Sequence, residues 1–112
     1  MTDIRFPFDV EKLFQKCKEN DSLPRNDFKK QAVLLRLLDD FKDRIYSEEE
    51  IGGIIREHFS DAVLIRREFV NFGYMRRDPR AGEYQVVKRA LTEEDIKNNT
   101  LLRRHAKELI TR

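Results

Sequence analysis

The chain has 112 residues, of which 39% are hydrophobic and 39% charged, and its formal net charge is +2. A chain of this length is expected to fold as one small domain, and eight phenylalanines and three tyrosines supply enough large apolar side chains to exclude intrinsic disorder. The small net charge neither requires nor excludes nucleic acid as a partner, but residues 60–91 carry seven basic and four acidic side chains, so the middle third has a basic excess.

A cytoplasmic location is the expectation from the cysteine content and the hydropathy. Cys17 is the only cysteine, so the chain has no intramolecular disulfide and lacks the cysteine spacings of common zinc sites. The longest aliphatic stretch, Ala32 to Leu35, ends at Arg36, and the first residues lack the apolar segment of a signal peptide. We therefore expect no membrane partner.

Two helices are expected in the N-terminal part of the chain. The first lies within residues 1–22, where Asp9 is a suitable cap and Cys17 falls on the apolar stripe. Because of that position, a small buried side chain is a better interpretation of Cys17 than a nucleophile. The second helix begins near Asn26 or Asp27, and its apolar stripe is wide enough for the central helix of a core.

A short strand and a capped helix are expected next. The pair Ile45–Tyr46 reads as a short extended segment, and Ser47 and Glu50 follow in the spacing of a capping box. A glycine inside a helix weakens it, and this cost is tolerated most easily where another helix approaches the backbone closely. The pair Gly52–Gly53 therefore indicates a tight helix crossing.

A further helix and a hairpin complete the middle of the chain. The helix is capped by Ser60 or Asp61, and Gly73 stands where a left-handed residue would end it. Beyond this glycine the hydrophobic period changes to two, and segments 74–77 and 83–87 flank a turn-rich run. This pattern predicts a β-hairpin.

The C-terminal part is expected to form helical segments. Thr92 with Asp95, and later Thr100, are suitable caps. The last helix places Leu102 and Leu109 on one face, opposite basic residues. An apolar surface of this kind needs a partner to cover it.

The order of the expected elements defines the predicted fold. Core helix, short strand, helix, tight turn, helix and hairpin is the order of the winged helix-turn-helix, in which the second helix of the pair can enter a DNA major groove. We therefore predict an α+β winged-helix domain, mainly helical, with a small antiparallel β-hairpin wing. One domain would span residues 1–112, with an N-terminal helix at 1–22, the winged-helix core at 23–90 and a C-terminal helical extension at 91–112.

Several segments of the middle region together resemble a known family. These segments are Arg44–Ile51, Asp61, Ile65–Val70, Gly73 and Arg77–Tyr84. From about Leu23 to Val87 the sequence is similar to an uncharacterised bacterial domain family of unknown function. Its members occur alone or at the C-terminus of winged-helix regulators related to arsenical-resistance-type repressors. The resemblance implies an association with transcription regulation and assigns no activity to particular residues.

Arginine and asparagine side chains on the fourth helix and the hairpin are the candidate contacts to double-stranded DNA. At 100° per residue, Arg67 projects away from the core, with Arg66 and Asn71 on its flanks. Arg67 and Asn71 are then expected to read base edges, and Arg66 to contact a phosphate. The hairpin residues expected to add phosphate or minor-groove contacts are Arg76, Arg77 and Arg80.

Association with a protein is the alternative for the same surface. Val63 and Val70 share the outward face of the helix, where aliphatic side chains favour a packed partner. The acidic run Glu48–Glu50 would repel a DNA backbone, and the arginines can also pair within the chain with acidic residues such as Glu68. The candidate interface residues for a homodimer or a regulatory protein partner are Val63, Val70, Leu102 and Leu109.

No combination of residues points to catalysis, to a metal or to a cofactor. His58 and His105 each lack a second histidine or a cysteine at ligand spacing. The glycines do not form a phosphate-binding loop, because the spaced glycines and the Lys-Ser/Thr pair are missing. We therefore expect a protein that is not an enzyme and that acts by association.

Overall fold

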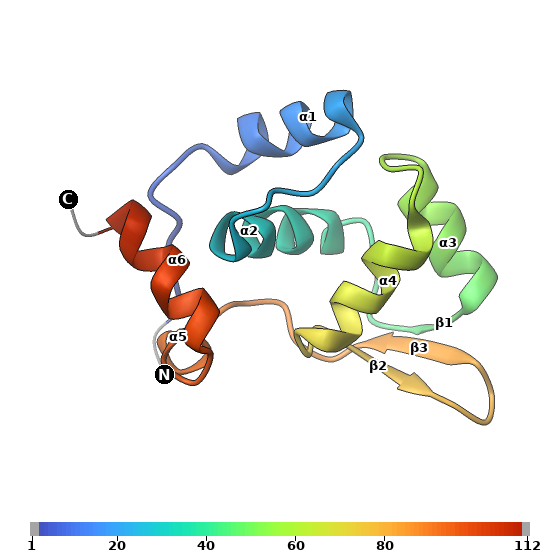
Figure 1. Cartoon of the computed structure of the whole chain (residues 1–112). Helices are drawn as coiled ribbons and strands as arrows, with labels where there is room; N and C mark the ends of the chain where they lie inside the picture. The colour runs from blue at the N-terminus through green and yellow to red at the C-terminus, as the bar shows by residue number, and fades with distance from the viewer. Residues whose placement is uncertain (1–2, 111–112) are drawn as a thin grey trace. The chain divides into compact units, whose positions relative to one another are not determined.

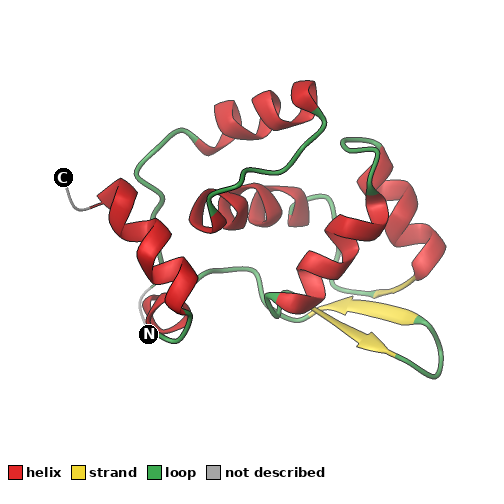
Figure 2. Cartoon of the chain, in the orientation of Figure 1, coloured by secondary structure: helices red, strands yellow, loops and turns green. Residues whose placement is uncertain are grey.

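The computed structural model describes residues 3–110, which form a mainly helical structure with one small antiparallel sheet (Figures 1 and 2). This agrees with the predicted α+β class. In chain order the elements are α1 (Val10–Asn20), α2 (Asp27–Leu38), β1 (Ile45–Ser47), α3 (Glu48–Arg56), α4 (Ala62–Asn71), β2 (Met75–Asp78), β3 (Glu83–Val86), α5 (Glu93–Lys97) and α6 (Thr100–Ile110). Within residues 3–110, no helix has both the length and the apolar character needed to cross a membrane.

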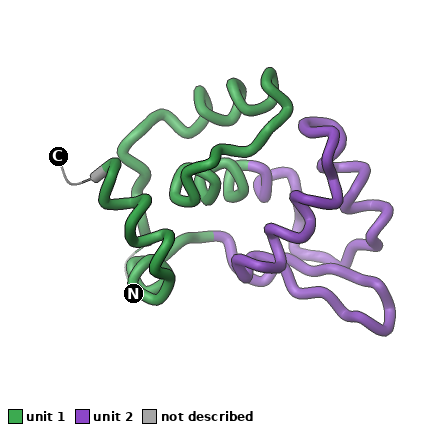
Figure 3. The backbone as a smooth tube through the Cα atoms, viewed as in Figure 1, with its two compact units in different colours: residues 1–36, 90–112 green, residues 37–89 purple. Residues whose placement is uncertain are grey.

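The chain divides into two compact units (Figure 3). The first unit comprises residues 1–36 and 90–112, and the second comprises residues 37–89. The boundary near residue 36 falls inside α2, so this helix contributes residues to both units. The second unit contains β1, α3, α4, β2 and β3, the elements that carry most of the candidate functional residues.

Capping side chains define the ends of the first two helices. The Asp9 carboxylate accepts a hydrogen bond from the Lys12 backbone N–H at 3.1 Å, so the predicted cap of α1 is confirmed. Asp21 ends this helix with a left-handed backbone, φ 51°. At the start of α2, the side-chain oxygen of Asn26 accepts from the Lys29 N–H at 3.0 Å. These caps satisfy backbone donors that the helices leave without an internal partner.

The apolar stripes of both helices are buried, as their spacing predicts. Phe14 and Cys17 of α1 are buried, which confirms the expected environment of the cysteine. Phe28 of α2 packs against the rings of Phe6 and Phe8, with centroids 5.1 and 6.4 Å away. These aromatic contacts give the first unit a core built from segments before and within α2.

The C-terminal part of the first unit corrects two expectations. Thr92 and Asp95 form the expected capping box of α5. The last helix, however, is capped by Asn99, whose side-chain oxygen accepts from the Leu102 N–H at 3.0 Å, and Thr100 is its first helical residue. Leu102, expected at a protein interface, is only 3% exposed because its face of α6 is buried by the chain itself. The expectation that Leu102 contacts a partner is therefore wrong.

A three-stranded antiparallel sheet in the order β1-β3-β2 lies in the second unit. The predicted hairpin is formed by β2 and β3, and its register places Arg77 opposite Tyr84. The extended pair Ile45–Tyr46 belongs to β1, which pairs with β3 so that Tyr46 also lies opposite Tyr84. The sequence predicts all three strands, but it does not indicate that β1 joins the hairpin.

Local sequence signals set the helix boundaries of the second unit. The Ser47 hydroxyl accepts from the Glu50 N–H at 3.1 Å, and the Glu50 carboxylate accepts from the Ser47 N–H at 2.9 Å, which confirms the capping box. Asp61 caps α4 by accepting from the Leu64 N–H at 3.0 Å. Gly73 follows this helix at φ 79°, a conformation that glycine adopts without steric cost.

The two glycines of α3 do not mark a tight helix crossing. The nearest atoms that a Cβ at Gly52 would meet belong to the guanidinium of Arg56, at 2.9 Å, in the same helix. A Cβ at Gly53 would meet no atom within 4 Å. The expected close approach of another helix at these positions is therefore wrong.

The core of the second unit places α4 beside the sheet. The ring of Phe41 packs edge-on against Tyr46 of β1 and Phe69 of α4, with centroids 5.5 and 5.9 Å away. The Tyr46 hydroxyl accepts a hydrogen bond from the Lys42 N–H at 2.7 Å, so this buried polar group has a partner. These contacts fix the exposed face of α4 next to the hairpin.

Candidate functional site

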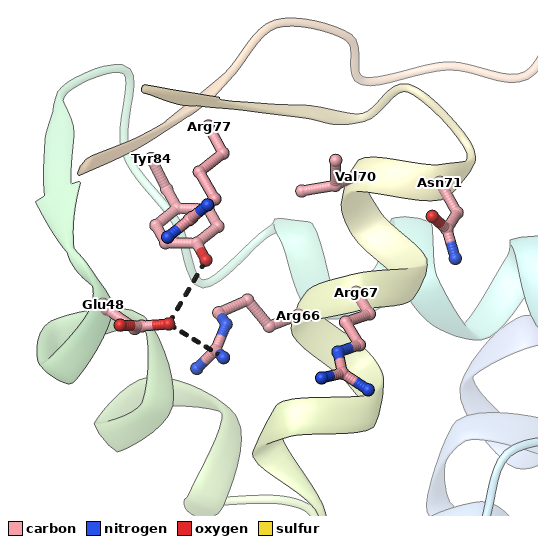
Figure 4. Close-up of a pocket in the computed structure, with 7 residues that line it drawn as sticks. All are labelled: Glu48, Arg66, Arg67, Val70, Asn71, Arg77 and Tyr84. Atoms are coloured by element: carbon pink, nitrogen blue, oxygen red, sulfur yellow. Dashed lines mark hydrogen bonds and ion pairs between the residues drawn. The ribbon is translucent and has the colours of Figure 1, made fainter. Parts of the chain in front are cut away.

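An arginine-rich cavity lies where α4, the hairpin and the first turn of α3 meet (Figure 4). Its volume is about 510 Å³, and all its lining residues belong to the second unit. They are Glu48, Arg66, Arg67, Val70, Asn71, Arg77 and Tyr84. Because three arginines face a single glutamate, the cavity carries an excess of positive charge.

One wall of the cavity is an internal ion pair. The Glu48 carboxylate lies 2.9 Å from the Arg66 guanidinium and accepts a 3.5 Å hydrogen bond from the Tyr84 hydroxyl (Figure 4). The Arg66 side chain is 17% exposed, whereas that of Glu48 is 48% exposed. Arg66 and Arg77 both lie within 6 Å of the Tyr84 ring, at 5.8 and 5.9 Å from its centroid. The buried tyrosine therefore supports two cationic groups through its ring face.

The outward face of α4 forms the opposite wall. Arg67 is exposed, as its helical position predicts, and no hydrogen bond or ion pair holds its guanidinium within residues 3–110. Asn71 lies one turn further along the same face, and its amide makes only a 3.5 Å hydrogen bond to Glu68. Val70 lies on this wall as well, nearer the hairpin than Asn71 (Figure 4). Arg67 and Asn71 are thus available to a partner.

The hairpin brings one of its three candidate arginines into the cavity. Arg77 shares a face of the hairpin with its cross-strand neighbour Tyr84. Arg76 is paired with Gln85, and because side chains alternate along a strand it lies on the opposite face of the hairpin. Arg80 lies in the turn, where its backbone N–H donates to the Asp78 carboxylate at 2.9 Å.

The structure therefore gathers only part of the predicted site. Arg66, Arg67, Asn71 and Arg77 come together with Val70, a residue predicted for a protein interface. The remaining candidates do not line the cavity; these are Val63, Arg76, Arg80, Leu102 and Leu109.

Glu48 and Tyr84 are the lining residues that the site prediction lacks. The cross-strand pairing of Arg77 with Tyr84 follows from the length of the hairpin turn and could have indicated the tyrosine. The sequence predicts ion pairs of the arginines with acidic residues such as Glu68, whereas the partner of Arg66 is Glu48. This pairing depends on how α3 packs beside α4, and nothing local in the sequence marks it.

Other chemically reactive side chains lie outside the cavity. Burial raises the pKa of the Cys17 thiol, which suits a structural role rather than a nucleophilic one. His58 makes a short contact to Asp40, with 2.5 Å between its Nε2 and the carboxylate. In the part of the chain that the structure describes, no group of three or more His, Cys, Asp or Glu side chains is arranged to hold a metal ion.

Comparison with known families identifies the family of this chain. The model of a bacterial family described as "Uncharacterized protein conserved in bacteria (DUF2087)" matches residues 21–86, more than half of the sequence. The chain therefore belongs to this family, and the resemblance noted between Leu23 and Val87 is confirmed. No curated protein and no solved structure matches the chain.

Proposed function

We propose that the chain is a winged-helix protein that binds double-stranded DNA and takes part in transcription regulation. The order of α2, β1, α3, α4, β2 and β3 supports this fold, because α3 and α4 then correspond to the helix pair and the hairpin to the wing. As a regulator in a bacterium it would act on DNA in the cytoplasm.

The clustering of arginines in one cavity between α4 and the hairpin is the observation that carries the proposal. Duplex DNA presents a dense row of phosphates, and arginines that neutralise them supply most of the sequence-independent affinity. Arg67 and Asn71 face outward one helical turn apart, so both could reach base edges from a helix in the major groove. Arg77 would contact a phosphate from the wing.

Substitution of individual arginines tests this function. Arg67→Ala should weaken binding of a preferred duplex by about 1 to 3 kcal/mol and relax its sequence preference. Arg77→Ala should weaken binding to every duplex and lower the salt dependence of the affinity. Arg76→Ala is the matched control, since it removes the same charge from the adjacent residue on the other face of the hairpin. Equal effects of the Arg76 and Arg77 substitutions would contradict the assignment of the cavity as the DNA-contacting face.

Protein association remains a second candidate because α4 exposes aliphatic side chains. Val63, Leu64 and Val70 are 46%, 48% and 36% exposed. Val63 and Val70 fall on the same face of α4, and aliphatic side chains gathered on one helix face favour a packed partner. Light scattering should then show a dimer that Val63→Ser weakens without adding charge, whereas a monomer at high concentration would count against self-association.

A further inference from the structure

The ion pair between Glu48 and Arg66 has a consequence for how the cavity binds anions. The Arg66 guanidinium is largely enclosed and already has a carboxylate 2.9 Å away. A phosphate group that approaches the same guanidinium must therefore compete with the Glu48 carboxylate, which is nearly half exposed and can move into solvent. The Tyr84 hydroxyl, which donates to the same carboxylate, would be released with it.

We propose that Glu48 is an internal competitor for phosphate at Arg66 and thereby limits the non-specific affinity of the protein for duplex DNA. This inference rests on the proposed DNA-binding function. With Glu48 in place, Arg67 and Arg77 are the arginines of the cavity that no carboxylate neutralises within residues 3–110. Because phosphate contacts carry no sequence information, suppressing one of them raises the share of the binding energy that comes from base contacts.

Neither neighbouring glutamate can serve in the same way. Glu50 belongs to the capping box, where its carboxylate accepts from Ser47 and binds the Arg44 guanidinium at 3.1 Å. Glu49 does not line the cavity, and within residues 3–110 its side chain makes no hydrogen bond or ion pair. The effect therefore belongs to one position in the acidic run, and Glu49 offers a control with the same charge on the same helical turn.

The exposure of the Glu48 side of the pair makes displacement of this carboxylate feasible, although Arg66 itself is largely enclosed. An ion pair that solvent reaches contributes little net stability, because water and salt compete for both partners. A phosphate backbone that also contacts Arg67 and Arg77 can thus replace the Glu48 carboxylate at small cost. A fully buried pair could not be exchanged in this way, because the separated carboxylate would lose its only favourable environment.

The salt dependence of duplex binding by Glu48→Gln and Glu49→Gln variants tests the proposal. Each phosphate contact adds about 0.9 to the slope of log affinity against log salt concentration. If Glu48→Gln frees Arg66 for one more phosphate, its advantage over the unmodified protein should be about three- to fourfold larger at 50 mM than at 200 mM salt. Glu49→Gln should leave the slope unchanged. The thermal unfolding of each variant checks that the fold is retained.

A double variant assigns the effect to Arg66. In Glu48→Gln/Arg66→Gln the added slope should disappear, because the freed guanidinium is absent. Equal slopes for the Glu48 and Glu49 variants, with the unmodified protein binding DNA, would overturn the inference and leave the proposed function standing. If neither the unmodified protein nor Glu48→Gln binds any duplex, the inference and the proposed function are both overturned. If Glu48→Gln alone binds, the result supports competition by Glu48 and refutes DNA binding by the natural chain.

Discussion

The imidazole Nδ1 of His105 accepts a hydrogen bond of 2.8 Å from the backbone N–H of Asp27. The donor is the first residue of α2, and the acceptor lies on α6, 78 positions later in the chain. Helices leave their first N–H groups without an internal partner, so a side chain from α6 completes the N-terminus of α2. The Asn26 amide adds a longer bond of 3.4 Å to the His105 carbonyl. Within the first unit, the beginning of α2 and the last helix are thus joined by polar contacts.

Replacement of His105 should therefore destabilise the protein. His105→Ala leaves the partly buried N–H of Asp27 without its acceptor, which we expect to lower the free energy of unfolding by about 1 kcal/mol. Urea denaturation followed by circular dichroism measures this change. Arg104→Ala is the control, because it alters an exposed neighbour on the same helix. The same urea midpoint for both variants would show that the histidine does not support α2.

Local signals in the sequence predict the helix ends well. The hydrogen bond between the Asp27 N–H and His105 is a contact that such signals do not predict. The caps at Asp9 and Asp61 and the capping box of Ser47 with Glu50 form because each pairs residues three positions apart. For His105 the sequence shows only that no second histidine or cysteine stands at ligand spacing. Its bond to Asp27 depends on how distant segments pack, and no local spacing encodes that packing.

The candidate site also contains features that local spacing predicts and features that depend on how distant segments pair or pack. The helical period places Arg67 outward correctly, because Ile65 and Phe69 of the same helix are buried. The choice between Arg76 and Arg77 requires the register of the hairpin, which depends on where its turn begins. The sequence also gives no means of telling that the apolar face of Leu102 is covered by the chain itself.

The capping box of α3 should make the free energy of unfolding depend on pH, with a contribution that is present at neutral pH and lost in acid. Hydrogen bonds from the Ser47 N–H and the Arg44 side chain hold the pKa of the Glu50 carboxyl below its usual value. A carboxyl whose pKa is lowered by folding stabilises the native state at pH values above its unfolded pKa, about 4.3. This contribution is lost as the pH falls through the lower folded value.

Glu50→Gln should accordingly be less stable than the unmodified protein at pH 7. The difference should shrink as the pH falls below about 4, because both proteins then carry a neutral group at this position. Unfolding curves at pH 7, 4 and 2.5 measure it. Glu49→Gln removes the same charge from the same turn without touching Ser47, and a matching pH dependence in that variant would contradict the role of the capping box.

Arg89 should contribute to stability by closing the end of α2. Its guanidinium donates to the carbonyls of Leu38 at 3.0 Å and Phe41 at 2.6 Å, and to the Asp43 carboxylate at 2.9 and 3.1 Å. We expect Arg89→Ala to lower the free energy of unfolding by about 1 kcal/mol, because backbone acceptors at a helix end lose a charged donor. Chemical denaturation measures the loss.

A lysine at this position should recover only part of that stability. A single ammonium cannot reach the carbonyls and the carboxylate in the fork geometry of a guanidinium. The free energy of unfolding of Arg89→Lys is therefore expected to lie between those of the unmodified protein and Arg89→Ala. Arg80→Ala removes a charge from the hairpin turn of the same unit and serves as the control. If Arg89→Lys were as stable as the unmodified protein, the guanidinium geometry would not matter.

The thiol of Cys17 should report on opening of the first unit. Its side chain is 7% exposed, and burial raises the pKa of the thiol above its ordinary value, so both access and thiolate content are low in the folded chain. A disulfide reagent at pH 8 should modify the native protein much more slowly than the protein in denaturing urea. The modification rate should rise in step with the unfolded fraction measured by circular dichroism, and His105→Ala should increase it because that substitution weakens the same unit. Rapid modification of the native protein would show instead that the helix carrying Cys17 opens independently of the rest of the unit.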